Sequence, residues 1–335
     1  MSFNWSALPL MPLADTVPAG TSLIMTPLPG LANLQVSGAD SYAFLQGQCS
    51  TDFREVEQGK VLPGAICSLK GRALFTYLAV PSGNTVHLLL PQDQLADAHA
   101  HLKKFSIFSK VTLAASDDAP LLGIDGAQAA AALSQLLQTA LPASGQAATT
   151  ADGIVVAAVT TDRYLLIMSA AQAEKITVEL QPMQDLATTE NAWHLAEIRA
   201  GLARIQATTR DQFQPQELNY PAVGGVSYTK GCYTGQEIVA RRHLLVRQRL
   251  GRSGNPIAFQ WLEDGGNVSR LDDTHQDFAR VEQAHIDLIA GPDGGTLRHV
   301  FGKSEAEAVA PGRNGGHSGF APLIYNGYKL PRTTS

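Results

Sequence analysis

The chain has 335 residues, of which 44% are hydrophobic and 16% charged, and its formal net charge is −5. These values are typical of a globular protein with two or three domains, and they exclude an intrinsically disordered chain. The acidic balance argues against direct nucleic-acid binding by the molecule as a whole. Since no apolar stretch approaches the roughly 20 residues of a membrane span, we expect no membrane association.

The cysteines and the N-terminal residues indicate the cellular compartment in which the protein works. There are three cysteines, an odd number, and no CxxC pair, which argues against a disulfide framework. The first basic residue is Arg54, so the N-terminus lacks the charged start of a secretory signal. We therefore expect a cytoplasmic protein.

The first half of the chain predicts a mixed α/β unit over residues 1–115, beginning with an irregular N-terminal arm to about residue 29. Pro81-Ser82-Gly83-Asn84 is strong turn chemistry, so the strands on either side of it should form a hairpin. Strands are predicted over residues 31–36, 61–68, 73–80 and 85–90, and helices from residue 41 and over 92–105.

A similar order recurs over residues 116–190, with a strand at 121–124, a helix at 128–141, a hairpin of 154–159 with 164–168, and a helix at 170–180. Strand, helix, paired strands and helix is the pattern of a split βαβ, ferredoxin-like unit, so we predict two such units side by side.

Two further segments complete the predicted order. A helix over 190–204, with an apolar face that includes Trp193, and a helix over 235–243 place residues 191–245 in a third segment that completes the core. The Gly- and Asp-rich remainder, 246–335, favours a small all-β C-terminal domain.

Reactive residue types are concentrated in Lys230-Gly231-Cys232-Tyr233-Thr234-Gly235-Gln236-Glu237. Glycines near Cys232 let a ligand approach the backbone closely, and the start of the following helix favours an anion. Lys230 or that helix start would lower the pKa of the Cys232 thiol and raise its thiolate fraction. A tight turn around a buried, inert cysteine explains the same spacing equally well.

Other candidate residues have simpler explanations. Cys49 and Cys67 are not spaced like zinc or iron–sulfur ligands, so we expect small core residues and no metal site. Trp193 is either a core anchor or a stacking surface for a planar ring. The basic residues between Lys230 and Arg252 favour a solvated helix face over a phosphate-binding patch.

The segment from Lys230 to Glu237 is similar to the signature of the YgfZ proteins, which are folate-binding relatives of the glycine-cleavage T protein. The resemblance runs from about Leu23 to about Arg242. Its further motifs are Gly38-Ala39-Asp40-Ser41, Gln46-Gly47-Gln48, Lys70-Gly71-Arg72, Phe108-Ser109-Lys110-Val111, Trp193 with Gly201, Pro215-Gln216 and Asn219.

The resemblance implies an α+β, T protein-like fold, with two ferredoxin-like units and a small C-terminal β-barrel around a central cavity for tetrahydrofolate or a one-carbon derivative. It also implies a role in assembling or repairing iron–sulfur enzymes, including those that thiomethylate tRNA. Cys232, with Lys230, would be the functional pair. The folate contacts implied are Trp193, Leu31 (at the position of a family tryptophan), Tyr233, Gly235, Gln236, Glu237 and Arg241.

One departure from the T protein bears on chemistry. That protein carries a pair of aspartates a few residues after a Gly-Gly turn, and one of them acts on folate during aminomethyl transfer. Here these positions hold Phe75 and Thr76, neither of which supplies a carboxylate. We therefore expect folate binding without aminomethyltransferase activity. The alternatives are a one-carbon transferase that uses Asp52 or Glu237, and, ranked last, an RNA-binding module that uses the arginines from 241 to 252.

Overall fold

The computed structural model describes residues 4–5, 17, 20–116, 119–183 and 185–241. The predicted all-β domain over 246–335 and the end of the 191–245 segment lie outside these residues. Within them, the strands form two sheets, one of five strands and one of six. In this part of the chain no helix combines the length and the hydrophobicity needed to span a bilayer.

The five-stranded sheet has the order β3-β4-β5-β2-β6, and all its neighbouring strands are antiparallel. Its strands are β2 (Leu31–Ser37), β3 (Leu62–Cys67), β4 (Ala73–Ser82), β5 (Thr85–Pro91) and β6 (Thr112–Ser116). One face packs against α1 (Ser41–Gln48), α2 (Phe53–Glu57) and α3 (Leu95–Phe105), the last preceded by the short 3-10 helix η2 (Gln92–Gln94). Phe53 and Leu102 are fully buried in this layer.

The six-stranded sheet has the order β11-β1-β7-β10-β9-β8. Its strands are β1 (Ile24–Pro27), β7 (Leu121–Asp125), β8 (Gln146–Thr149), β9 (Val155–Ala158), β10 (Arg163–Ile167) and β11 (Leu186–Ala187). Its outer face is covered by α4 (Ala129–Leu137) and α5 (Ala170–Leu180). Helix α5 starts with a capping box, in which the side chains of Ser169 and Gln172 satisfy each other's backbone N–H groups.

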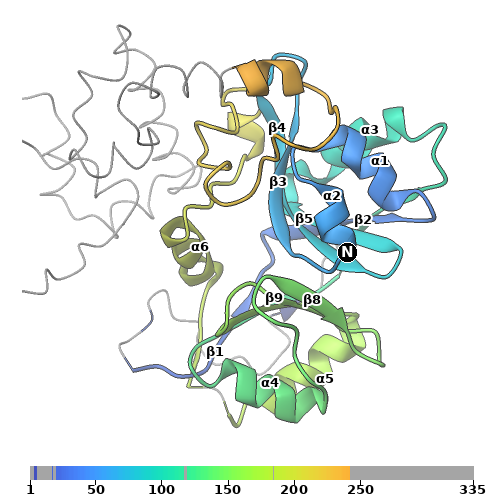
Figure 1. The fold of residues 1–335 in the computed structure, drawn as a ribbon. Coiled ribbons are helices and arrows are strands. Elements are labelled where there is room, and N and C mark those ends of the chain that lie inside the picture. The colour runs from blue at the N-terminus through green and yellow to red at the C-terminus, as the bar shows by residue number, and fades with distance from the viewer. Residues whose placement is uncertain (1–3, 6–16, 18–19, 117–118, 184, 242–335) are drawn as a thin grey trace, which may run out of the picture.

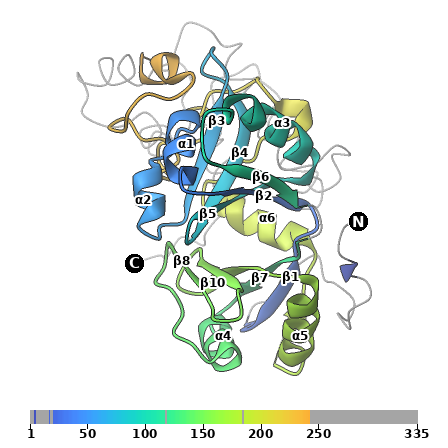
Figure 2. The same cartoon turned by 90° about the vertical axis from the view of Figure 1, so that its right-hand side faces the viewer.

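The two sheets face each other across a shared apolar cluster, so the molecule is layered as helices, sheet, sheet and helices (Figures 1 and 2). Leu31 and Leu89 reach this cluster from the five-stranded sheet, and Leu121 and Leu165 reach it from the other. Trp193, on α6 (Glu190–Arg199), completes the cluster at one side. The chain then continues through the short helix η3 (Ala207–Thr209) onto the β3–β4 side of the five-stranded sheet.

The predicted combination of helices and sheets in an α+β fold is confirmed, as are both predicted hairpins, β4 with β5 and β9 with β10. Among the described strands, every neighbouring pair is antiparallel except β1 with β11. The division into two separate ferredoxin-like units stays a prediction. The boundary at residue 115 assigns the N-terminal arm to the first unit, yet its strand β1 lies in the six-stranded sheet between β7 and β11. The physical reason is that β1 hydrogen-bonds on both sides, in parallel with β11 and antiparallel with β7, and so joins these two strands in one sheet.

The helix predicted over 190–204 is shorter than expected. It ends at Arg199, because Gly201 adopts a φ of +75° that stops the helical path. Of the predicted apolar face only Trp193 is buried, and the second buried residue of the helix is Glu197. The face buries a carboxylate because a partly buried arginine pairs with it, as described below.

Candidate functional site

The segment that contains Cys232 lies directly on the turn between β3 and β4. Gly235 has a φ of +83°, and a Cβ placed there would lie 2.4 Å from the carbonyl oxygen of Ser68 and 3.1 Å from the Cβ of Cys67. Gly71, in the turn itself, has a φ of +69°, and a Cβ there would lie 2.8 Å from the Cβ of Ile238. The two glycines therefore allow the backbones of the segment and the turn to touch.

Lys230 anchors the start of this segment. Its side chain is buried, and its Nζ donates hydrogen bonds to the carbonyl oxygens of Cys49 at 2.6 Å and Thr51 at 2.7 Å. The Nζ also lies 5.0 Å from the centroid of the Tyr233 ring. Burial lowers the pKa of Lys230 to about 8. The ammonium is directed at these carbonyls, and its predicted effect on the Cys232 thiol stays a prediction.

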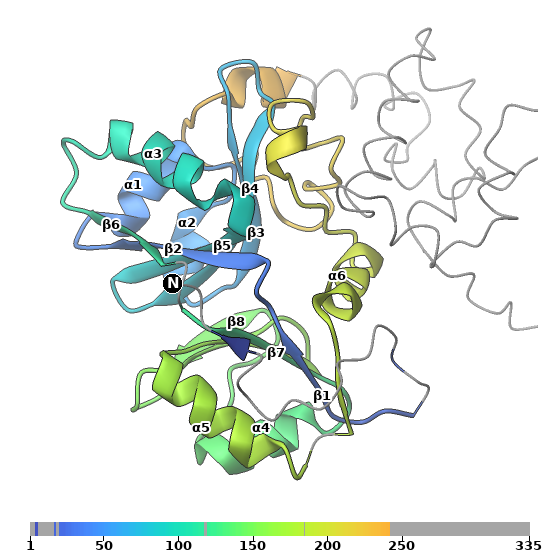
Figure 3. The same ribbon diagram turned by 180° about the vertical axis from the view of Figure 1, so that it is seen from behind.

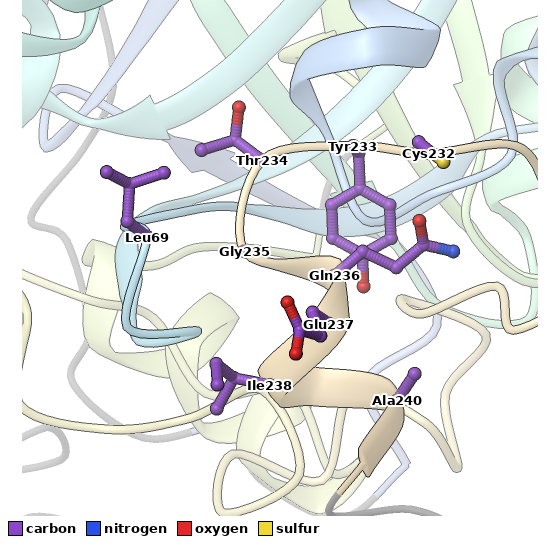
Figure 4. Close-up of a pocket in the computed structure, with 9 residues that line it drawn as sticks. All are labelled: Leu69, Cys232, Tyr233, Thr234, Gly235, Gln236, Glu237, Ile238 and Ala240. Atoms are coloured by element: carbon purple, nitrogen blue, oxygen red, sulfur yellow. The ribbon is translucent and has the colours of Figure 1, made fainter.

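A pocket of about 470 Å³ opens at the segment (Figure 4). Cys232 is exposed in it, and Leu69, from the β3–β4 turn, lines it with a side chain that is 84% exposed. This volume falls in the range of small-molecule sites, roughly 300–1,000 Å³. The residues that line the pocket are Leu69, Cys232, Tyr233, Thr234, Gly235, Gln236, Glu237, Ile238 and Ala240.

The predicted folate contacts fall into two groups. Tyr233, Gly235, Gln236 and Glu237 line the pocket, and Arg241 pairs with Glu237 at 3.1 Å beside it. The other two predicted contacts, Trp193 and Leu31, belong to the apolar cluster between the sheets.

Trp193 is enclosed by protein on several sides. Only 2% of the residue is exposed, and the Arg163 guanidinium lies 3.7 Å from the centroid of its ring. Arg163 also donates to the Trp193 carbonyl oxygen at 2.7 Å. A Cβ on Gly123 would lie 2.4 Å from the ring, so the indole packs tightly against β7. A planar ligand would have to displace Arg163 in order to stack on this face.

Glu197, which is buried, and Arg204, which is partly buried, form an ion pair beside Trp193. The Trp193 Nε1 donates to Glu197 at 3.0 Å, and both Arg204 Nε and Nη2 donate to the carboxylate. Burial opposes the ionisation of Glu197, but Arg204 offsets this effect and holds the pKa of the carboxyl below its usual value. Sequence reasoning missed this pair. Its available signal was the four-residue spacing from Trp193 to Glu197, which places both side chains on one face of a helix.

The region around this ion pair holds too little space for a folate in this conformation. The cavity there, which Thr76 and Tyr220 also line, measures about 30 Å³. That is room for ordered water only. The polar groups and the volume at Cys232 fit a small ligand better, since the exposed carboxylate of Glu237 and the half-buried amide of Gln236 line a pocket of about 470 Å³.

The residues that replace the T protein's aspartates have structural contacts. Phe75 packs in the core of the five-stranded sheet, with its ring centroid 5.7 Å from that of His101. The Thr76 Oγ1 accepts a hydrogen bond from the Ile205 N–H at 2.8 Å. Asp52, an alternative carboxylate, caps α2, and its hydrogen bond from Arg54 lowers its pKa to about 2. Of the two alternatives, only Glu237 lines the pocket.

The remaining cysteines lie in the core, as predicted. Cys49 and Cys67 are both fully buried, and burial raises the pKa of the first to about 11 and of the second to about 12. Their thiols are therefore neutral and unreactive at physiological pH. Among the described residues, no cluster of three or more His, Cys, Asp and Glu side chains is arranged to hold a metal ion.

The chain resembles known proteins across most of its length, although no family model matches it. It is 34% identical to the tRNA-modifying protein YgfZ of Enterobacter sp. (strain 638), over 83% of this chain and 81% of the relative. It is 31% identical to the protein of the same name from Yersinia pseudotuberculosis, over 76% of this chain and 74% of the relative.

Among solved structures, the glycine cleavage system aminomethyltransferase T from Bartonella henselae superposes with a TM-score of 0.54 at 14% identity. The match covers 68% of this chain and 64% of that one, less than two thirds of its length. It therefore shows a shared fold alone. The sequence identities to the YgfZ proteins exceed 30% over about four fifths of the chain, and these identities show family membership. The chain belongs to the YgfZ family.

Proposed function

We propose that this chain is a cytoplasmic, folate-binding accessory protein that supports the assembly or repair of iron–sulfur enzymes, and thereby tRNA modification, with Cys232 as its functional thiol. The observation that carries the proposal is the exposed Cys232 in a pocket of about 470 Å³ that Gly235, Gln236 and Glu237 also line. The name of the relatives, tRNA-modifying protein YgfZ, supports the tRNA-related part.

The segment holds the thiol in place through contacts at both of its ends. Lys230 ties the start to two carbonyls, and Gly235 presses the end onto the β3–β4 turn. Bound tetrahydrofolate would supply a one-carbon carrier beside the thiol. Glu237 and Gln236 would accept or donate hydrogen bonds to its polar edge, and exposed Leu69 would contact its apolar part.

The first test is calorimetric titration of the purified protein with tetrahydrofolate and its methylene and formyl forms. We expect Glu237→Gln to weaken binding about tenfold, the loss of one charge-assisted hydrogen bond. Glu57→Gln, at an exposed glutamate at the end of α2, should bind as the wild type does. Failure of every folate form to bind would remove the folate from the proposal.

The second test addresses the thiol. In cells that lack their own YgfZ protein, the wild-type chain should restore thiomethylated nucleosides in tRNA, as measured by mass spectrometry. Cys232→Ala should restore none while retaining the wild-type unfolding midpoint. A fully active Cys232→Ala variant would show that the thiol has no functional role.

The alternative, a one-carbon transferase, depends on Glu237, since this carboxylate lines the pocket and Asp52 is held by Arg54 and Gln46. It requires turnover of methylene-tetrahydrofolate with an amine acceptor, which Glu237→Gln would abolish. We expect no turnover across a panel of amines, because Phe75 and Thr76 occupy the positions of the T protein's aspartates.

A further inference from the structure

The loop between α3 and β6 displays large apolar side chains to solvent. Phe108 is 98% exposed and Ile107 75%, and Phe105, the last residue of α3, is 46% exposed. Isolated exposed apolar residues are ordinary, but these three lie within four positions and form a patch. Phe105 packs partly against His101, with 5.2 Å between the ring centroids, whereas the described residues leave most of Ile107 and Phe108 uncovered. The patch is bordered by exposed lysines that have no ion pair among the described residues: Lys103, Lys104 and Lys110.

This exposure is not that of a loose loop, because hydrogen bonds fix the backbone on both sides of the patch. The Ser106 Oγ donates to the Lys103 carbonyl at 3.1 Å, and the Ser109 N–H donates to the Ser106 carbonyl at 3.0 Å. The Lys110 N–H donates to the Asp40 carboxylate at 2.7 Å. A rigid loop that displays Ile107 and Phe108 loses little entropy when a partner covers them.

The strand that follows the loop, β6, is the last of the five-stranded sheet and pairs with β2. Thr112, Ala114 and Ala115 on it are exposed. Natural edge strands are usually protected by a charge, a proline or a bulge. β6, Thr-Leu-Ala-Ala-Ser, has no charged residue or proline, and its register with β2 is continuous over all five residues. Among the described residues, no strand pairs with its outer edge, which therefore offers backbone donors and acceptors next to the apolar patch.

We propose that this edge docks an extended segment of a partner protein, which adds to the sheet as a strand beside β6. Alternate apolar side chains of that segment cover Ile107 and Phe108, and its acidic residues pair with the lysines around them. The row of backbone groups on β6 selects a polypeptide, because only another backbone matches its spacing. The net charge of −5 opposes polyanions such as RNA or an anionic membrane, whereas a local acidic segment needs only the local lysines.

The docking surface is separate from the Cys232 pocket. The loop and β6 lie on the side of the five-stranded sheet away from α6 (Figure 3), and the pocket is built on the β3–β4 turn at the other end of the strand order. The proposal therefore does not rest on the proposed function, and the two fail in different experiments.

The probe is a library of random 12-residue peptides displayed on phage, selected on the full chain and counter-selected on an Ile107→Ser/Phe108→Ser variant. We expect the enriched peptides to alternate apolar residues and to carry Asp or Glu. As synthetic peptides they should bind the variant at least tenfold more weakly, and their binding should weaken in high salt. Bound peptide should also slow amide hydrogen exchange at residues 112–116, which a contact with the apolar patch alone would not do.

Val178→Ser, at an exposed valine on α5, is the matched control and should bind each peptide as the wild type does. The double variant changes only exposed side chains, and an unchanged unfolding midpoint would confirm that it folds. The proposal is overturned by peptides that bind the double variant equally well, or by unchanged exchange at 112–116. It is equally overturned if tRNA, anionic phospholipid vesicles or a second copy of the chain binds in a way that requires Phe108.

Discussion

The three thiols of the chain differ in burial, and this difference sets their reactivity. Cys49 and Cys67 are fully buried with raised pKa values, and Cys232 is exposed. A thiol-specific chromogenic reagent should therefore modify a single cysteine in the native protein and two more after denaturation. Cys232→Ala should leave no thiol that reacts in the native state. Rapid modification of a second thiol in the folded chain would contradict the burial of this pair.

His87, on β5, makes the stability of the fold sensitive to acid. Its Nδ1 lies 3.2 Å from the Asn33 Oδ1, and burial lowers its pKa from 6.5 to about 4. The unfolded chain binds the proton at a higher pH than the folded chain does. The stabilisation that neutral His87 gives to the folded state is therefore intact above about pH 6.5 and is lost as the pH falls towards 4.

Urea unfolding at pH 7 and pH 5 tests this. The wild type should lose about 2 kcal/mol of unfolding free energy through His87 over this interval. His87→Gln, which does not titrate, should lose correspondingly less. An equal loss in both proteins would place the acid sensitivity elsewhere.

Some of these residue roles follow from the sequence and others do not. The isolated spacing of Cys49 and Cys67 predicts core residues, and both are buried. The spacing of Trp193 and Glu197 on one helix is visible in the sequence, but their meeting with Arg163 and Arg204 is not predictable. Arg163 comes from β10 and Arg204 from the segment after α6, and both reach this pair only in the folded chain.

At the scale of elements, the pocket depends on close contact between the β3–β4 turn and the Cys232 segment. Gly235→Ala should break this contact, because its Cβ would lie 2.4 Å from the Ser68 carbonyl oxygen. Gly224 has a similar φ, +77°, but no atom lies within 4 Å of a Cβ built there, so Gly224→Ala bears only the backbone strain. That strain is about 1–2 kcal/mol.

Urea unfolding and the alkylation rate of Cys232 distinguish the two glycine variants. Gly235→Ala should lose more than about 2 kcal/mol of unfolding free energy and change the alkylation rate, because the turn and the segment must separate. Gly224→Ala should keep the wild-type rate. Equal behaviour of both variants would show that φ alone explains the need for Gly235.

The elements that sequence patterns predict correctly are those with strong local signals. Pro81 to Asn84 sets the β4–β5 hairpin, and the helix over 170–180 is found as α5 with the bounds predicted. The patterns miss β6, β8 and β11, which are short and, in the first two, largely exposed, so they lack the apolar alternation of a half-buried strand. The sheet to which β1 belongs depends on contacts with residues more than 90 positions away.

At the scale of the whole molecule, the cluster that contains Trp193 joins the two sheets. Trp193→Ala should cost about 3–5 kcal/mol, the range for removing a large buried side chain. Because both sheets share the cluster, we expect the loss of the Trp193 side chain to separate unfolding into two steps. Circular dichroism measured during urea unfolding would detect them. Val178→Ala, at an exposed position, should change the midpoint little. A single sharp transition in Trp193→Ala would mean that other contacts couple the sheets.

The place of β1 in the six-stranded sheet has a consequence for biosynthesis. The ribosome releases β1 early, but its antiparallel partner β7 follows about 100 residues later, and Asp185, which binds the Ser22 N–H, comes 163 residues after that serine. All strands of the five-stranded sheet emerge within that interval, between residues 31 and 116. Co-translational folding should therefore begin with the five-stranded sheet, and β1, although it is made before that sheet, should be incorporated only after it.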